Sequence, residues 1–425
     1  MVPNGWESKT FASLIKSGDI TQIQDGNHGN SHPKSSDFVP SGIPFIMARD
    51  LTNGSINFTN CSYIARKQAD SLRIGFSFPG DILLSHKGTV GQVAIVPEVD
   101  DYIMLTPQVT YYRLPQSSKL HNLYLYQYFL SSGFQERLKY LSAQSTRSYI
   151  GITAQKELPI TLPPLPEQRK IAKILSTWDK AITTTEKLIE TSKQQKKALM
   201  QQLLTGKKRL VNPETGKVFE GDWEEVKLGD AVHIGRGFAF KSSQYASTGT
   251  KIVRVTNIAS SGHIDLSDCV FVPKDIAGEY QKYALKSEDV LLVMVGATAG
   301  KLGFVTPEIL PSLLNQNMWS LRTKDNCALH QSFLKQIAEQ IVSRYMLTQQ
   351  GSARGFFTQS TFELVKFSIP VVEEQQKIAS VLTAAEKEIE VLEAKLSHFK
   401  QEKKALMQQL LTGKRRVKVD EMEVA

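Results

Sequence analysis

Two long stretches of the chain carry apolar side chains at steps of three and four residues. The first stretch has Ile171, Leu175, Trp178, Ile182, Ile189, Leu199 and Leu203. The second has Ile378, Leu382, Ile389, Leu392, Leu396, Phe399, Leu406 and Leu410. This spacing predicts two amphipathic helices, each with the heptad seam of a coiled coil. Because a single helix of about 40 residues, about 60 Å long, cannot bury such a seam alone, we expect the two helices to pair in antiparallel orientation.

Antiparallel pairing would place the segments that precede the helices at opposite ends of a rod. The alternative is that each helix packs onto its own preceding segment. Prolines mark the expected helix starts at Pro163, Pro164, Pro166 and Pro370, and glycines mark the ends at Gly206 and Gly413. Polar residues interrupt the seam at Thr185, Ser192, Lys196 and Lys403. Such residues can fix the register of a coiled coil at some cost in stability.

The segments before the helices mix short β-type runs with turn residues. Runs rich in branched side chains cover 90–96, 251–255 and 289–295, and Gly-containing turns lie at 52–55 and 259–263. Helical patterns cover 123–141 and 331–347. We therefore predict an α+β fold with two similar globular domains separated by the helix pair.

An internal duplication relates the two halves. QQKKALMQQLLTGKKR (194–209) and QEKKALMQQLLTGKRR (401–416) match at an offset of 207 residues (401 − 194). The same offset aligns 166–175 with 373–382, and SAQSTRSYIG (142–151) with QQGSARGFFT (349–358). Farther upstream only the strand and turn pattern recurs. The predicted domains are 1–158 and 213–367, and the predicted helical segments are 159–212 and 368–425.

Charge adds a weak indication of a polyanionic partner. The net charge is +9, and basic residues gather at 193–209 and 400–418, which are copies of one another. These clusters could contact a DNA backbone between half-sites, or they could be a solvated or partner-facing helix end. Their similarity favours partner and structural roles. The three cysteines show no CxxC spacing, and we find no signal peptide and no apolar run of about 20 residues, so we expect a cytoplasmic protein without a membrane contact.

No constellation of catalytic residues emerges from the sequence. VGATAGKL (295–302) is one residue short of a P-loop, and Leu302 stands where Ser or Thr would bind magnesium. We interpret it and its copy around Lys87 as glycine turns between strands. We interpret His86, beside Lys87, as a surface residue or a satisfied structural residue and not as a catalytic base. No histidines have metal-ligand spacing. The prediction is a binding protein that is not an enzyme and holds no cofactor or metal.

The repeated motif resembles a known family. ITLPPLPEQRKIAKIL (160–175), its downstream helix ending KKALMQQLLTGKKRL, and the copy of both resemble the specificity subunits of Type I restriction–modification systems. The second copy departs from the motif at Val371, Val372 and Glu373, which replace the Pro-Leu-Pro run. The resemblance covers essentially the whole chain.

The resemblance implies two target-recognition domains, each reading one half of a bipartite, asymmetric double-stranded DNA site. It implies a helical spacer that docks two methyltransferase subunits, with motor–nuclease restriction subunits joining the complex. S-adenosylmethionine, ATP and magnesium would then belong to the partners. Half-sites read by rigidly linked domains tend to lie about one DNA turn, about 34 Å, apart. The rival hypothesis is a self-contained DNA-binding or adaptor protein without methyltransferase partners, and a purely structural spacer is a third.

Residues that could contact DNA are polar and sit in loops at corresponding places in the two halves. In the first half the candidates are His28, Asn30, Lys34, Arg49, His86, Lys87, Thr89 and Gln108. In the second half they are Arg236, Lys241, Ser243, Arg254, Asn257, Thr298 and Gln316. The shared Arg147 and Arg354, each near a serine and an aromatic residue, suggest a phosphate contact or a brace between domain and helix.

The resemblance also suggests where methyltransferase subunits dock. The repeated motif at the start of each helix offers polar and apolar residues that recur in both copies. The candidates for this partner contact are Gln168, Lys170, Ile171, Gln375, Lys377 and Ile378.

Overall fold

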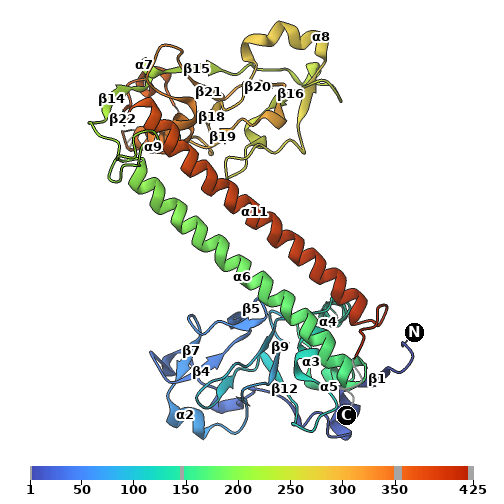
Figure 1. Ribbon diagram of the computed structural model, residues 1–425. Helices are drawn as coiled ribbons and strands as arrows, with labels where there is room; N and C mark the ends of the chain where they lie inside the picture. The colour runs from blue at the N-terminus through green and yellow to red at the C-terminus, as the bar shows by residue number, and fades with distance from the viewer. Residues whose placement is uncertain (1, 144–147, 349–356, 420–425) are drawn as a thin grey trace. The chain divides into compact units, whose positions relative to one another are not determined.

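A computed structural model describes residues 2–143, 148–348 and 357–419 of the chain (Figure 1). The chain forms two compact units. Unit 1 comprises Met1–Lys187 and Ala394–Ala425, and unit 2 comprises Leu188–Glu393. The boundaries between the units fall inside two long helices, so each unit contains part of both. Each unit is described by itself below.

Unit 1 contains a four-stranded sheet, a five-stranded sheet and two small strand pairs. The four-stranded sheet has the order β10 (Val93–Ile95), β9 (Ile82–Ser85), β12 (Val109–Arg113), β2 (Gln22–Asp25). The five-stranded sheet has the order β3 (Phe38–Val39), β7 (Ser62–Ile64), β4 (Ile43–Ile46), β11 (Ile103–Leu105), β8 (Phe76–Ser77). The small pairs are β1 (Glu7–Thr10) with β13 (Pro159–Leu162), and β5 (Leu51–Thr52) with β6 (Ser55–Ile56).

The helices of unit 1 lie mainly on one face of the four-stranded sheet. They are α1 (Phe11–Lys16), α2 (Arg66–Ser71), α3 (Asn122–Leu130), α4 (Ser132–Ala143), α5 (Ile152–Lys156) and the first part of α6 (Leu165–Leu203). The helical pattern at 123–141 is confirmed, but Ser131 has extended backbone angles and separates α3 from α4.

Alternation along the strands of unit 1 produces two cores. On β9, Ile82 and Leu84 face the helices, whereas Leu83 faces the five-stranded sheet. On β12, Tyr112 belongs to the helix side and Tyr111 to the sheet side. The four-stranded sheet is therefore buried on both faces, between a helical layer and a second sheet.

Unit 2 repeats this arrangement with fewer strands. Its larger sheet has the order β15 (Val232–Arg236), β21 (Met318–Thr323), β18 (Val290–Val293), β19 (Leu302–Phe304), and its smaller sheet has the order β17 (Val270–Val272), β16 (Thr250–Val253), β20 (Ser312–Leu314). β14 (Glu224–Lys227) pairs with β22 (Lys366–Ile369) as β1 pairs with β13. The helices are α7 (Leu228–Ala231), α8 (Lys274–Ala277), α9 (Gln331–Thr348), α10 (Gln359–Phe362) and the first part of α11 (Val372–Leu410).

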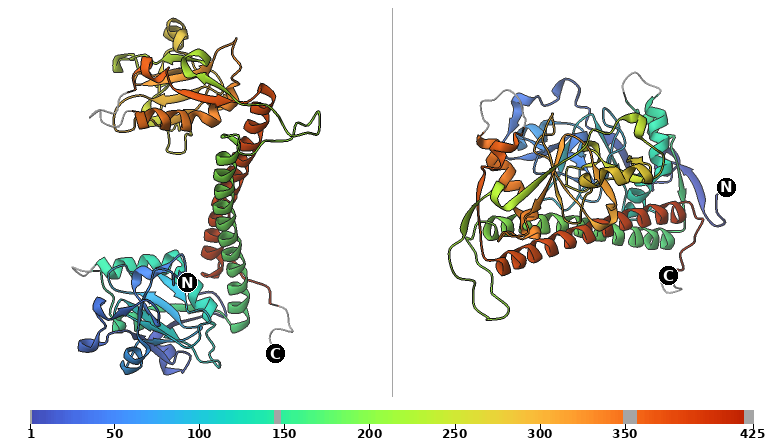
Figure 2. Two further views of the ribbon diagram at one scale, coloured as in Figure 1. Left: turned by 90° about the vertical axis from the view of Figure 1, so that its left-hand side faces the viewer. Right: turned by 90° about the horizontal axis from the view of Figure 1, so that it is seen from above.

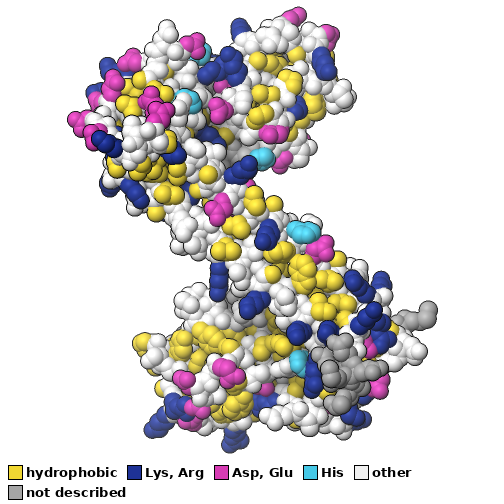
Figure 3. Space-filling view, viewed as in Figure 1, with side chains coloured by type: hydrophobic (Ala, Val, Ile, Leu, Met, Phe, Trp, Pro, Cys, Tyr) yellow, Lys and Arg dark blue, Asp and Glu magenta, His cyan; other side chains and the backbone are white. Residues whose placement is uncertain are grey.

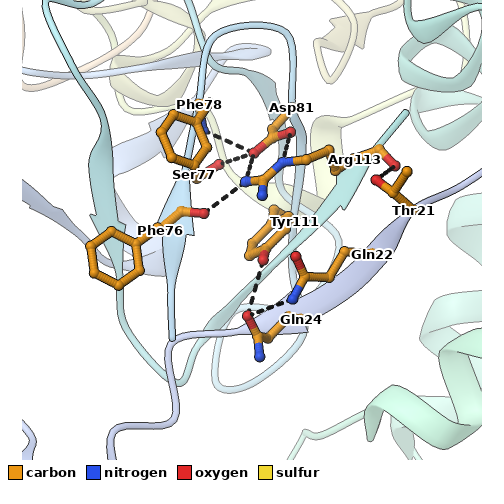
Figure 4. Close-up of polar contacts among 9 residues, drawn as sticks. All are labelled: Thr21, Gln22, Gln24, Phe76, Ser77, Phe78, Asp81, Tyr111 and Arg113. Atoms are coloured by element: carbon orange, nitrogen blue, oxygen red, sulfur yellow. Dashed lines mark hydrogen bonds and ion pairs between the residues drawn. The ribbon is translucent and has the colours of Figure 1, made fainter. Parts of the chain in front are cut away.

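In each unit, one end of the four-stranded sheet carries an ion pair with a buried carboxylate. In unit 1 the Arg113 guanidinium bonds both carboxylate oxygens of Asp81, at 3.0 and 2.7 Å, and lies over the ring of Tyr111 (Figure 4). In unit 2 Arg322 bonds Asp289 in the same two-pronged way, at 2.7 and 2.5 Å. These pairs satisfy carboxylates that are almost fully buried. The opposite end of each sheet, where β9 and β18 finish, is free for loops.

α6 and α11 are paired in both units, and the prediction of an antiparallel coiled coil is confirmed (Figures 1 and 2). In unit 1 an early residue of α6 meets a late residue of α11, because Trp178 packs edge-on against Phe399. In unit 2 a late residue of α6 meets an early residue of α11, because Lys196 of α6 pairs with Glu386 of α11 at 2.9 Å. The alternative, that each helix packs onto the globular segment before it, is also partly right. Ile171 and Leu175 at the start of α6 belong to the core of unit 1.

Three of the predicted polar seam residues, Thr185, Lys196 and Lys403, have partners within their units. Lys403, only 12% exposed, pairs with Asp179 at 2.5 Å, and the Thr185 hydroxyl donates to the Ala181 carbonyl oxygen. The interpretation of 295–302 as a glycine turn is confirmed as well. Gly296 and Gly300 have φ values of 91° and 92° between β18 and β19, a region that favours glycine.

Candidate nucleic-acid interface

Loops gather at the open end of the sheets in unit 1. β2, β4, β9 and β11 all finish there, and β12 begins there. Backbone bonds tie the loops together: the His86 N–H donates to the Gln108 carbonyl oxygen, the Ile150 N–H donates to that of His86, and the Thr106 N–H donates to that of Ile46. We call this end of unit 1, formed by the loops after these strand ends, loop edge 1.

Unit 2 has the same backbone frame at the same place. The Met294 N–H donates to the Asn317 carbonyl oxygen, the Phe357 N–H donates to that of Met294, and the Asn315 N–H donates to that of Val253. We call this end of unit 2 loop edge 2. The two edges therefore share their backbone links, although almost every side chain on them differs. Such a frame can present different side chains to similar ligands.

Most of the DNA candidates of the first half lie on loop edge 1 or on the loops beside it. Asn30, Lys34, Arg49, Lys87 and Thr89 are exposed. Gln108 is half-buried, and its side-chain oxygen accepts a hydrogen bond from the Ala48 N–H. The exposed members are thus available to a ligand, whereas Gln108 also holds a neighbouring loop.

His86 is at loop edge 1 but does not reach the surface. Its side chain is 1% exposed, its Nδ1 lies 3.0 Å from the Ile150 carbonyl oxygen, and Tyr149 packs on the ring. Since a carbonyl only accepts, Nδ1 carries the proton. The structural role predicted for His86 agrees with this geometry, whereas direct base reading by His86 does not, because the ring is covered.

The candidates of the second half divide in the same way. Arg236, Lys241, Ser243, Thr298 and Gln316 are exposed. Arg254 is partly engaged, since its guanidinium donates to the Asp268 carbonyl oxygen.

Asn257 is not a surface residue. It is 3% exposed, its Oδ1 accepts from the Arg254 N–H, and its Nδ2 donates to the Asp265 carbonyl oxygen. Asp50 does the same in unit 1, where its carboxylate accepts from the Met47 N–H at 2.8 Å. Asn257 therefore caps a loop, and its placement among base readers was wrong because its polar side chain is consumed by backbone groups. Arg147 and Arg354 lie outside the described residues.

The repeated motif is turned inward rather than toward a partner. Gln168 is 1% exposed, accepts from the His121 N–H, and donates to the carbonyl oxygens of Lys119 and Pro163. Gln375 is fully buried and makes the copied set of bonds with His330, Ala328 and Pro370.

The two motif isoleucines, Ile171 and Ile378, are fully buried in the cores of their units. The placement of these isoleucines and of the two motif glutamines on a docking surface was wrong, because helix and domain already use them. Of the motif candidates, Lys170 is half-buried and Lys377 is exposed.

The motif glutamates form joints that the sequence interpretation missed. In unit 2 the Arg209 guanidinium binds the fully buried Glu374 carboxylate through three hydrogen bonds of 2.7 to 3.0 Å, and it also donates to the Gly221 carbonyl oxygen. In unit 1 Arg416 binds Glu167 with the same atoms and donates to the Asn4 carbonyl oxygen. Each joint connects the start of one long helix to the segment that follows the other.

The basic clusters at 193–209 and 400–418 supply both joints and several pairs along the helices. Lys193 pairs with Glu393 at 2.6 Å, and Lys400 pairs with Glu186 at 2.7 Å. Basic side chains also gather over the C-terminal part of α11 on the face shown in Figure 3. The structural interpretation of these clusters therefore fits the geometry better than a DNA contact.

Burial lowers the pKa of four histidines in unit 1, which are His28, His32, His86 and His121. In the unfolded chain each takes up a proton near pH 6.5, whereas the folded unit resists protonation to lower pH. Unfolding below pH 6.5 therefore binds protons, and we expect the free energy of unfolding of unit 1 to fall as the pH is lowered below that value.

Urea unfolding at pH 7.5 and 5.5, followed by hydrogen exchange of unit 1 peptides, measures this dependence. His86→Asn should reduce it, and replacement of the exposed His398 by glutamine should leave it unchanged. Equal or greater stability of unit 1 at pH 5.5 would contradict the expectation.

Within residues 2–143, 148–348 and 357–419 there is no group of three or more His, Cys, Asp or Glu side chains that could hold a metal ion. No helix in this part of the chain is long and apolar enough to cross a bilayer.

Comparison with known proteins connects this architecture to one family. Residues 10–193 and 220–400 match the family described as Type I restriction modification DNA specificity domain. The Type I restriction enzyme MjaVIII specificity subunit of Methanocaldococcus jannaschii is 27% identical over 98% of this chain and 94% of its own length. The crystal structure of a Type-I restriction-modification system S subunit from M. genitalium superposes with a TM-score of 0.61, at 16% identity, over 96% of this chain and 97% of that one. A chain from a structural study of complex assembly in a type I R-M system gives a TM-score of 0.55, at 16% identity, over 98% and 100%.

Proposed function

Because the chain belongs to the family of Type I restriction–modification DNA specificity domains and carries two copies of that domain, we propose that it is the specificity subunit of such a system. It binds a bipartite, asymmetric DNA target and performs no chemistry itself. Loop edge 1 reads one half of the target, and loop edge 2 reads the other half.

The contrast between the two kinds of duplicated surface supports this proposal most strongly. The joints keep the same atoms in both copies, with Arg209 on Glu374 and Arg416 on Glu167. The loop edges keep only their backbone links, while the side chains differ. Two readers that share a frame and differ in side chains suit a target with two unlike halves, since sequence is read by side chains at base edges.

We further propose that the partners are double-stranded DNA, two methyltransferase subunits and restriction subunits. Methyl transfer and cleavage then take place on these partners, which bind S-adenosylmethionine, ATP and magnesium. Gln168, Gln375 and the buried isoleucines of the motif cannot form the docking surface. Exposed side chains on the outer faces of α6 and α11 remain for it, among them Leu188 and Val391, which are 49% and 59% exposed.

Co-expression of the full chain with the methyltransferase subunit from the same genome, in a host without DNA methylation, tests the proposal. Mapping of methylated bases should yield one two-part motif. Exchange of residues 1–158 for those of another family member should change one half of the motif only. A chain that purifies alone and directs no methylation would favour the stand-alone DNA-binding alternative, and a change in both halves would contradict the assignment of one half to each domain.

A further inference from the structure

Asp25 and Arg236 occupy the same position in the two units. Asp25 is the last residue of β2 and lies opposite Thr110 of β12. On its other side, Thr110 lies opposite Leu84 of β9. Arg236 is the last residue of β15 and lies opposite Trp319 of β21. On its other side, Trp319 lies opposite Leu292 of β18.

A glycine follows each of the two residues and fixes how the strand ends. A Cβ added to Gly26 would lie 1.7 Å from the Leu105 carbonyl oxygen, and one added to Gly237 would lie 1.8 Å from that of Asn315. Both glycines thus let the chain cross closely over the neighbouring strand end. Asp25 and Arg236 therefore stand at corresponding strand ends at loop edges 1 and 2.

The chemistry at this shared position is opposite in the two units. The Asp25 carboxylate has no lysine or arginine within 4 Å among the described residues. Its titratable neighbour is His86, whose Nε2 lies 3.6 Å from Asp25 Oδ2. Burial lowers the pKa of His86, and its proton is on Nδ1 toward the Ile150 carbonyl oxygen, so Nε2 presents a lone pair. Nε2 of His86 and Oδ2 of Asp25 are therefore two acceptors that face one another, and no donor from the described residues bonds His86 Nε2.

Arg236 presents donors instead. Its guanidinium is exposed, and Nε and Nη2 both donate to Gln359 Oε1, at 3.1 and 2.7 Å. Gln359 in turn donates to Glu363 at 2.8 Å, which fixes the orientation of the acceptor. Among the described residues, the partner of this guanidinium is the Gln359 amide oxygen, and no ion pair with a carboxylate involves it. None of the described residues bonds its Nη1.

We infer that Asp25 and Arg236 are matched specificity-determining residues, of which Asp25 accepts a hydrogen bond from a base amino group and Arg236 donates to guanine O6 and N7. A carboxylate repels phosphate, so at a DNA-facing edge its favourable contact is a base amino group, either N4 of cytosine or N6 of adenine. Arginine pairs with guanine through two acceptors. The inference rests on the proposed function and deepens it.

The test uses the full chain with its methyltransferase subunit and compares the methylated motifs of variants. Asp25→Asn keeps the oxygen that accepts from the Asn27 N–H, at 3.2 Å, and so preserves the local turn. We expect it to reduce the preference at one cytosine or adenine position in one half-motif by at least about fivefold. The wild-type base at that position distinguishes cytosine from adenine as the source of the amino group. Arg236→Gln should reduce the preference at one guanine position in the other half-motif to a similar extent.

The control variants each remove a charge of the same sign at the ends of the sheets opposite loop edges 1 and 2. Asp100→Asn and Lys274→Gln replace exposed residues away from loop edges 1 and 2 and should leave the motif unchanged. Asp25→Glu retains the acceptor and should retain the base identity. If Asp25→Asn abolishes methylation altogether, retained preference in Asp25→Glu supports the inference, and lost preference in it overturns the inference.

An unchanged motif in Asp25→Asn at normal methylation efficiency would overturn the inference, as would loss of preference in the same half-motif as Arg236→Gln. Absence of any two-part motif with the wild-type chain would instead overturn the proposed function itself. The two failures are therefore distinguishable.

Discussion

Replacement of Arg209 by alanine should lower the free energy of unfolding of unit 2 by about 3 kcal/mol. The change removes all three hydrogen bonds from Arg209 to the Glu374 carboxylate, which is fully buried and would be left without a counterion. Breaking a buried ion pair from one side is costly because the remaining charge cannot return to water. The Arg209 side chain is 19% exposed, so water relieves part of the cost, and the estimate is at the lower end of the usual range.

Hydrogen exchange of amides in the first turns of α11, together with urea unfolding, measures this loss. Alanine in place of the adjacent exposed Lys208 is the matched control and should change stability by less than about 0.5 kcal/mol. The double variant Arg209→Met with Glu374→Leu should recover most of the loss, since it leaves no buried charge. A single variant as stable as the control would show that the joint contributes nothing.

Replacement of Gln375 by leucine should destabilise unit 2 by about 3 kcal/mol. Leucine has a similar size, so the loss comes from the amide and not from a cavity. The His330 N–H and the carbonyl oxygens of Ala328 and Pro370 would each lose their partner inside the protein. Buried groups left unsatisfied cost about 1–3 kcal/mol each, and partial access of water lowers their sum.

Leucine in place of the neighbouring Gln376, which is exposed, serves as the control for this variant. Urea unfolding should separate the two by more than 2 kcal/mol. Gln168→Leu should reproduce the effect in unit 1, because the bonds are the same. If the Gln375 and Gln376 variants were equally stable, the motif glutamine would have no structural role, and a partner contact would again need consideration.

Sequence periodicity predicted the helix pair because a heptad seam reports directly on burial. Runs of branched residues predicted strands at 90–96, 251–255 and 289–295, and β10, β16 and β18 overlap these runs. The alternation of Leu83 and Leu84 between two cores was not predicted. The duplication predicted that both halves share one fold. What periodicity cannot report is which polar side chain finds a distant partner, since Arg209 and Glu374 are 165 residues apart.

Several candidate site residues were misassigned because the sequence does not show which polar side chains have partners inside the protein. Gln168 and Gln375 were assigned to a partner surface because they recur, yet a repeated internal joint makes residues recur equally well. The signal that could have distinguished the two was present, since Glu167 with Glu374, and Arg209 with Arg416, recur at the same offset with opposite charges. Asn257 was misplaced because an exposed and a loop-capping asparagine look alike in a sequence.

The equivalence of the two joints has a consequence for assembly. Because Arg209 and Arg416 are interchangeable in chemistry, and so are Glu167 and Glu374, the joints by themselves do not distinguish a helix of the same chain from one of another molecule. A single chain closes correctly because its own helices are at a high effective concentration for one another. Separated halves, or a chain held at high concentration while it folds, lose that advantage and are open to domain swapping. Unique closure therefore depends on tethering and on unrepeated contacts such as that of Trp178 with Phe399.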